Sequence, residues 1–222
     1  MYKYDLHVHT KETSPCAHVA AAEMIEVYRD NGYSGVVITD HYRPVFFNTS
    51  ESTTWEEKVE DFLKGYRNAK YQGDKYGMDV LLGIEFAFNN TKTNDFLIYG
   101  ITEEMLMKST DLFNLGFEGL SKFCKENNLL FFQAHPLRGY CSLEDIAFLD
   151  GVEVHNGNPR HDSHNDEIEV IASENNLYMI SGSDFHEYGD ENNGGIITSN
   201  RIKTNDDLIE VLKSKDYTLF RG

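Results

Sequence analysis

The sequence has few cysteines, few basic residues and no long apolar run, and each shortage excludes a class of protein. Its three cysteines, Cys16, Cys124 and Cys141, are too few and too scattered for the disulfide framework of a small secreted domain. No apolar run approaches the roughly 18 residues that a membrane-spanning helix needs, and the amino-terminal residues lack the apolar core of a signal peptide. We therefore expect a cytoplasmic protein without a membrane partner.

The charge balance is strongly acidic. Lys and Arg total 20 against 37 Asp and Glu, which gives a formal net charge of −17. Because long nucleic acids are bound through basic surfaces that neutralise phosphates, we expect no long nucleic-acid partner, although a mono- or dinucleotide stays open. The sequence indicates no oligomeric state.

No linker, repeat or low-complexity segment divides the chain, so we expect one domain over residues 1–222. Apolar runs typical of strands occupy residues 4–8, 35–39, 80–85, 96–99, 129–134, 151–155, 178–181, 195–198 and 217–220. Helical periodicity occupies residues 21–31, 55–76, 117–127, 165–176 and 206–214. This alternation predicts an α/β fold with a mostly parallel sheet, and the number of strands favours a closed or distorted barrel. The polar segment 43–54 is expected to form a long irregular loop.

Metal-binding residue types follow the predicted strands. Six of the nine histidines and two acids stand at the carboxyl ends of six predicted strands: His7, His9, His41, Glu85, His135, His155, Asp184 and His186. In a barrel these strand ends converge on one mouth, where sites are built. Any one of these eight residues alone is weak support for a site. Two other histidines, His161 and His164, lie in a polar stretch and are expected to be solvated. The joint pattern predicts a site.

Imidazoles combined with carboxylates suit zinc, manganese or iron better than calcium, which prefers oxygen ligands. His7 and His9 have the i, i+2 spacing that points two side chains to the same side of a strand. Eight donors exceed the three or four protein ligands that one zinc ion takes. The pattern therefore predicts more than one divalent ion.

These residues lie in motifs that resemble the PHP (polymerase and histidinol phosphatase) family. The motifs are Asp5-Leu6-His7-Val8-His9-Thr10, Thr39-Asp40-His41, Gly83-Ile84-Glu85, Ala134-His135-Pro136, Glu153-Val154-His155-Asn156 and Gly182-Ser183-Asp184-Phe185-His186. The resemblance implies a distorted (β/α)7 TIM-like barrel that holds two to three Zn, Mn or Fe ions.

The same resemblance implies a ligand set for each ion. One ion would be bound by His7, His9, Glu85 and Asp184, and a second by Glu85, His135 and His155. A third would be bound by His41 and His186. In this sequence the loop after His9 offers Cys16 or His18 for a further ligand of the third ion, or leaves the position to water.

The function that the resemblance implies is metal-dependent hydrolysis of a phosphate ester. The expected enzyme is a histidinol-phosphatase-like phosphomonoesterase acting on a small phosphorylated molecule through a metal-bridged hydroxide. We expect catalytic roles for Glu85, Asp184 and Arg138, phosphate binding by Arg138 and Arg160, and orienting roles for Asp5 and Asp40. Two alternatives stay open. One is a phosphodiesterase or exonuclease acting on nucleotides or short oligonucleotides, and the other is a non-catalytic metal-stabilised binding domain.

Overall fold

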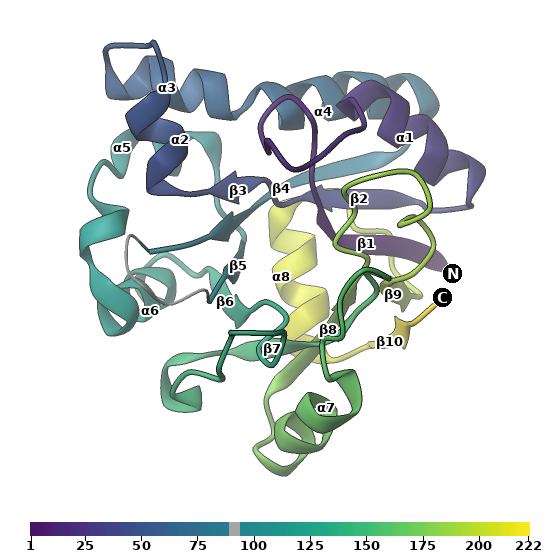
Figure 1. The fold of residues 1–222 in the computed structure, drawn as a ribbon. Coiled ribbons are helices and arrows are strands. Elements are labelled where there is room, and N and C mark those ends of the chain that lie inside the picture. Colours follow the sequence, from purple (N-terminus) through teal and green to yellow (C-terminus); the bar gives the residue numbers. More distant parts are fainter. Residues whose placement is uncertain (89–93) are drawn as a thin grey trace.

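The computed structural model describes residues 1–88 and 94–222, and its strands form one sheet that nearly closes into a barrel (Figure 1). The strands are β1 (Tyr2–Val8), β2 (Gly35–Ile38), β3 (His41–Tyr42), β4 (Asp79–Phe86), β5 (Phe96–Tyr99), β6 (Leu130–Gln133), β7 (Gly151–Asn156), β8 (Tyr178–Gly182), β9 (Gly195–Thr198) and β10 (Tyr217–Phe220). They pair in the order β10-β9-β1-β2-β4-β5-β6-β7-β8, with β3 beside β4. A single parallel bridge between Val8 and Phe185 joins the ends of β1 and β8. The predicted α/β barrel is confirmed.

The sheet is mixed, whereas the sequence predicted a mostly parallel one. Pairs β1–β2, β2–β4, β6–β7 and β7–β8 are parallel, but β5 runs antiparallel to both β4 and β6. Strands β4 and β5 follow each other with no helix between them in the described residues, and two strands joined without a crossover pair antiparallel. The amino end of β5 therefore lies at the same mouth as the carboxyl end of β4.

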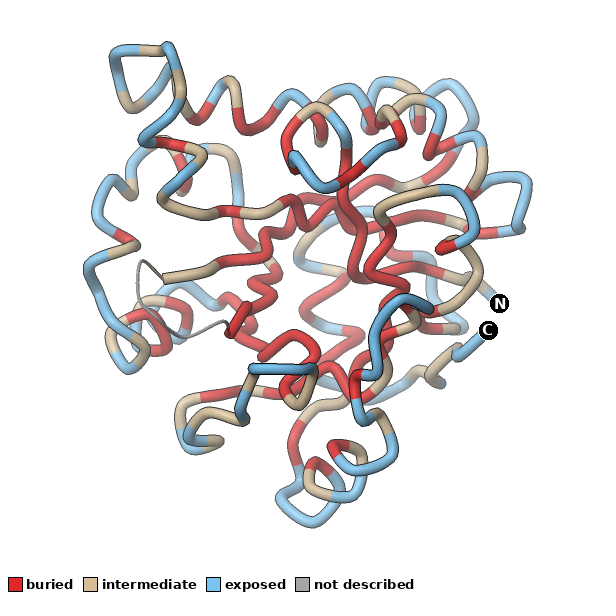
Figure 2. The backbone as a smooth tube through the Cα atoms, viewed as in Figure 1, coloured by how far each residue is buried: buried red, intermediate tan, exposed pale blue. Residues whose placement is uncertain are grey.

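Helices cover the outside of the barrel, and the buried part of the chain follows the strands (Figure 2). The helices are α1 (Ala21–Asp30), α2 (Pro44–Thr49), α3 (Trp55–Phe62), α4 (Lys64–Tyr76), α5 (Glu103–Lys108), α6 (Gly116–Glu126), α7 (Asn165–Glu174) and α8 (Asn205–Ser214). The segment expected as an irregular loop over residues 43–54 contains α2, a short helix that starts at Pro44, where proline is tolerated. In residues 1–88 and 94–222, every helix is too short or too polar to cross a bilayer.

The helix predicted over residues 55–76 is two helices, α3 and α4, which meet at Leu63. The start of α4 packs closely on the loop after β1. A Cβ at Gly65 would lie 1.9 Å from Thr10 Oγ1, so the contact requires glycine there. This packing fixes the loop that follows His9.

In the view of Figure 1, helix α8 is seen through the ring of strands. Its buried residues Leu208, Ile209 and Leu212 belong to one apolar cluster with inward side chains of the strands, among them Leu6, Leu81 and Phe132. Apolar packing therefore fills the end of the barrel next to α8, and polar side chains collect at the opposite end.

Candidate metal centre

Seven of the eight predicted metal-binding residues meet at one mouth of the barrel. They are supplied by β1 and the residue after its end, by β3 and β4, and by the segments that follow β6 and β8: His7, His9, His41, Glu85, His135, Asp184 and His186. The rings of His41 and His186 are partly exposed, whereas the other five side chains are at most 5% exposed. The convergence expected from strand ends is therefore present in the structure.

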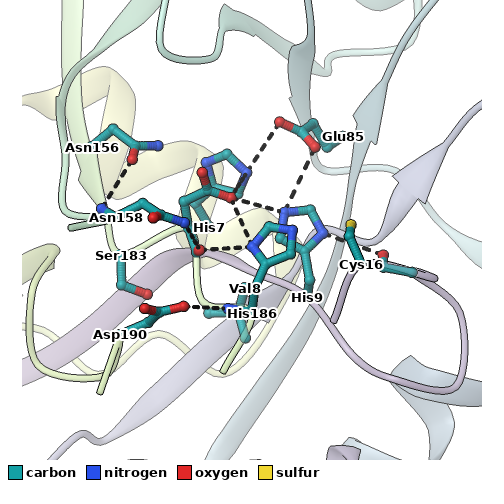
Figure 3. Close-up of polar contacts among 12 residues, drawn as sticks. His7, Val8, His9, Cys16, Glu85, Asn156, Asn158, Ser183, His186 and Asp190 are labelled. Atoms are coloured by element: carbon teal, nitrogen blue, oxygen red, sulfur yellow. Dashed lines mark hydrogen bonds and ion pairs between the residues drawn. The ribbon is translucent and has the colours of Figure 1, made fainter. Parts of the chain in front are cut away.

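The Glu85 carboxylate is the centre of this cluster, and Figure 3 shows it pointing toward the rings of His7 and His9. Its Oε1 lies 3.2 Å from His7 Nε2 and 3.1 Å from His135 Nε2. Its Oε2 lies 2.5 Å from His41 Nδ1 and 3.6 Å from His9 Nε2. Four imidazoles thus share the two oxygens of one fully buried carboxylate, which is the arrangement that a bridging ligand needs.

Asp184 supplies the second carboxylate. Its Oδ1 lies 3.4 Å from His7 Nε2, 3.3 Å from His9 Nε2 and 3.4 Å from His186 Nδ1. Its Oδ2 accepts a hydrogen bond from Arg138 Nη1 at 2.8 Å. Asp184 and His135 both have left-handed backbones, with φ of 54° and 28°, a conformation that costs energy for non-glycine residues and recurs at functional sites.

Several donor atoms in this cluster are buried without a hydrogen-bond partner: His7 Nε2, His9 Nε2, His41 Nδ1, Glu85 Oε2 and His135 Nδ1. Buried polar atoms are costly to leave unsatisfied, so such a concentration indicates a binding site for a cation. A cation bound at about 2.0–2.2 Å to nitrogen and oxygen holds its donors about 3.0–3.5 Å apart, which is the range of most distances around Glu85 and Asp184. The donor set fits divalent metal ions.

Asp95, immediately before β5, is a candidate ligand that the sequence reasoning missed. One oxygen or nitrogen of each of Glu85, Asp95 and His135 lies within 4.8 Å of the others, and all three residues are buried. The prediction considered only the carboxyl ends of strands. Because β5 is antiparallel, its amino end reaches the same mouth, and an acid at the start of a strand was the signal to look for.

His155 lies outside the cluster, so the structure does not bring it to the expected place beside Glu85 and His135. Its Nε2 lies 3.0 Å from the Asn193 carbonyl oxygen, and its Nδ1 lies 3.2 Å from the Asn165 amide. The pairing of β7 with β8 shifts register between Glu153 and His155, and the inserted residue reverses the alternation of side chains. Glu153 consequently faces inward and is fully buried.

Neighbouring side chains hold the histidines in place. Glu153 Oε1 accepts from His7 Nδ1 at 2.9 Å, which leaves His7 Nε2 directed at Glu85. Asp5 accepts hydrogen bonds from the backbone N–H groups of His7 and Ser183, so the predicted orienting role is exerted on the backbone. Such partners fix the orientation of metal ligands.

Asp40 was expected to orient the His41 ring, but it holds the loop after His9 instead. Its carboxylate accepts from the Thr10 backbone and hydroxyl and from the Ser14 hydroxyl, each at 2.7 Å. Ser14 Oγ in turn lies 3.3 Å from His9 Nδ1 and accepts from the His41 backbone N–H at 3.1 Å.

The charges of the cluster are strongly coupled. Burial opposes ionisation of Glu85, but the imidazoles of His41 and His7 outweigh it and hold the pKa of Glu85 well below its usual range. Burial also opposes a proton on His41, yet Glu85 and Cys16 outweigh it and raise the pKa of His41 to about 10. Burial, with the neighbouring His186 and His41, lowers the pKa of His9. Glu85 thus favours positive charge at the nitrogens that face it, which are positions where cations would bind.

A cavity of about 630 Å³ opens over the cluster. Three arginines line it, and each is held by acidic partners. Arg138 donates to Asp184, Asn156 and Ser163, and Arg160 donates to Asp190 and Glu187. Arg43 donates to Asp95 at 2.9 Å. Both predicted phosphate-binding arginines therefore border the space above the donor set.

Comparisons with known proteins find a matching family and solved structures of similar fold. A family model described as PHP domain matches residues 5–211. A two-domain protein from Bacteroides vulgatus ATCC 8482, which contains a predicted PHP-like metal-dependent phosphoesterase, has a TM-score of 0.72 at 15% identity. That match covers 99% of this chain and 64% of the other, so this chain spans just under two thirds of that protein.

Two further solved structures have the same fold. A predicted metal-dependent phosphoesterase from Bifidobacterium adolescentis ATCC 15703 has a TM-score of 0.54 at 18% identity, with 95% of each chain covered. The lesion-specific endonuclease PfuEndoQ from Pyrococcus furiosus has a TM-score of 0.61 at 14% identity, with 98% of this chain and 57% of the other covered. No curated protein matches the chain.

Proposed function

The chain belongs to the PHP domain family, and from this membership and its donor set we propose that it hydrolyses a phosphomonoester of a small molecule with two to three bound Zn, Mn or Fe ions. The family match confirms the resemblance carried by the sequence motifs. A cytoplasmic location and a small phosphorylated partner are part of the same proposal.

The observation that carries the proposal is the set of buried, unpartnered donor atoms around Glu85 and Asp184, directly below a cavity. His7, His9, Glu85 and Asp184 would hold one ion, and Glu85, Asp95 and His135 a second. Divalent ions supply Lewis acidity there: they lower the pKa of water and neutralise charge on phosphoryl oxygens.

The protein's own contribution is to fix these donors before substrate arrives. Glu153 fixes one nitrogen of His7, so that the other nitrogen stays free for a cation. Arg138 engages only Oδ2 of Asp184 and leaves Oδ1 facing the imidazoles. Donors held in this way need little rearrangement on binding, which favours tight and correctly placed cations.

We assign phosphate recognition to Arg138, with Arg160 at the rim. The Arg138 side chain is 15% exposed and borders the cavity, and three of its five N–H groups are used by protein partners. Its remaining N–H groups can donate to a phosphoryl oxygen. Arg160 is 37% exposed, and Asp190 and Glu187 engage both of its terminal nitrogens, which makes it the weaker candidate.

A phosphodiesterase or nuclease activity is the second candidate, favoured by the shared fold of the Pyrococcus furiosus endonuclease. The net charge of −17 argues against a long polyanionic substrate but permits a nucleotide or a short oligonucleotide. A non-catalytic binding domain is the third. The open cavity above the donor atoms argues against it, because binding of metal for stability alone needs no such cavity.

Two measurements test the proposal. Elemental analysis of protein purified without chelators should find two to three equivalents of Zn, Mn or Fe. The metal-loaded protein should then hydrolyse a chromogenic phosphomonoester faster than the matching diester. The class of leaving group is then identified with a panel of substrates: sugar phosphates, histidinol phosphate, phosphotyrosine peptide and a nucleoside 3′,5′-bisphosphate. Less than one equivalent of metal, or no turnover of any ester, would overturn the proposal.

A further inference from the structure

We propose that Cys16 binds the outermost cation of this centre through its thiolate, together with His41 and His186. The inference rests on the proposed function and assigns a ligand to the part of the site nearest solvent. Cys16 borders the cavity, and it lies at the edge of the cluster in Figure 3.

The geometry of the sulfur supports this role. Cys16 Sγ lies 3.2 Å from His41 Nε2, and its thiol also forms a hydrogen bond with His186. Bond lengths of about 2.3 Å to sulfur and about 2.0–2.1 Å to nitrogen place two donors of a tetrahedral zinc site about 3.5 Å apart. The sulfur therefore stands within a few tenths of an ångström of the separation that a shared cation requires.

A second observation points to a cation at the same place. One ring nitrogen of each of His9, His41 and His186 lies within 4.8 Å of the others. His9 Nε2 is buried in this group without a hydrogen-bond partner, and the His9 side chain is fully buried. A cation bound among these three imidazoles would supply the contact that His9 Nε2 lacks.

The loop that carries Cys16 is fixed at both sides of the residue. Before it, the Asp40 carboxylate holds Thr10 and Ser14. After it, the His18 backbone N–H donates to the His186 carbonyl oxygen at 2.7 Å. Cys16 is thus tied to the segment that carries its partner ligand.

His18 was the alternative ligand from the sequence. It borders the cavity and is exposed, as Cys16 is, but the Cys16 thiol contacts both His41 and His186, whereas within residues 1–88 and 94–222 the His18 ring forms no hydrogen bond or ion pair with either. The structure therefore favours Cys16 over His18.

A thiolate at this position changes which metal the outer site selects. Sulfur ligands favour zinc and other thiophilic ions, whereas carboxylate and water ligands suit magnesium and manganese. The inner positions around Glu85 and Asp184 have only nitrogen and oxygen donors. We therefore expect the outer position to prefer zinc or cobalt over manganese, while the inner positions accept either.

Cobalt(II) reconstitution tests the assignment through a readout independent of catalysis. The metal-free protein loaded with cobalt(II) should show a near-ultraviolet thiolate-to-cobalt charge-transfer band. Cys16→Ser should abolish the band and lower bound cobalt by about one equivalent. Cys141→Ser is the matched control, because Cys141 also borders the cavity, and this variant should keep the band. A band that survives Cys16→Ser, or that disappears only in Cys141→Ser, would overturn the proposal.

A second measurement needs no variant. Iodoacetamide should alkylate Cys16 in the chelator-treated protein and at least tenfold more slowly in the zinc-loaded protein, as followed by peptide mass spectrometry. Equal rates in both forms would contradict thiolate ligation. Turnover of a phosphomonoester is measured in parallel: no turnover with the charge-transfer band present would overturn the proposed function alone, and turnover without the band would overturn the cysteine assignment alone.

Discussion

Replacing Asp95 by asparagine is the sharpest test of the inner metal positions. Asp95 is one of three buried donors grouped with Glu85 and His135, and its Oδ1 also accepts from Arg43 Nη2 at 2.9 Å. Burial and the neighbouring Glu85 raise the pKa of Asp95, and a cation bound beside this carboxylate would favour its charged form. Asparagine keeps the size of the side chain and removes the charge.

The magnitude follows from the contact that is lost. If the carboxylate contributes only as much as a charge-assisted hydrogen bond, about 1.5–3 kcal/mol, the affinity for one cation falls about 10- to 150-fold. A direct bond to the metal is stronger than a hydrogen bond, so this range is a lower bound for the loss of affinity. The occupancy of the position shared with His135 should therefore fall by about one equivalent when metal is limiting.

The assay is competition with a chromogenic chelator, followed by elemental analysis of the protein. His155→Ala is the matched control, because His155 contacts Asn193 and Asn165 outside the cluster, and its affinity should stay within about threefold of wild type. Arg43→Gln removes the ion pair with Asp95 and should leave cation affinity unchanged or higher, since a positive charge is lost beside the site. Wild-type affinity in Asp95→Asn together with metal loss in His155→Ala would refute the reasoning.

Three further predictions concern the same centre. Glu85→Gln should abolish turnover, because the charge that bridges the cations is lost, and its circular dichroism spectrum should stay unchanged. Activity within about tenfold of wild type would show that Glu85 is only structural. Arg138→Ala should lower kcat/KM for monoesters by roughly 10- to 1,000-fold and for diesters by less, because the substitution removes a charge-assisted contact of about 1.4–4 kcal/mol. Full activity of this variant would exclude a phosphate-binding arginine at this position. Metal binding to the metal-free protein at pH 7 should release protons, and metal should bind more tightly as the pH rises. The reason is that the pKa of His41 is raised to about 10 and that of His135 to about 9, so both rings must lose a proton before they bind metal. Titration calorimetry in two buffers of different ionisation enthalpy measures the number of protons released, and a value of zero contradicts the prediction.

The sequence by itself determined most of the strands and most of the centre. Each of the nine predicted strands forms, with ends shifted by two residues at most, because short β-branched and aromatic runs between helical periods leave few other assignments. Seven of the eight predicted donors meet at the mouth because the ends of barrel strands converge whatever the details of packing.

Only the tertiary structure decided the direction of β5 and the alternation along β7. Strand direction depends on which neighbours a strand pairs with, and the antiparallel β5 brings Asp95 to the mouth from the start of a strand. The side to which a side chain points depends on register, and the bulge in β7 turns Glu153 inward and His155 away. The position of Cys16 likewise depends on Asp40, on a different strand end, which holds the loop before it. These are contacts between residues far apart in the chain, and local pattern carries no information about them.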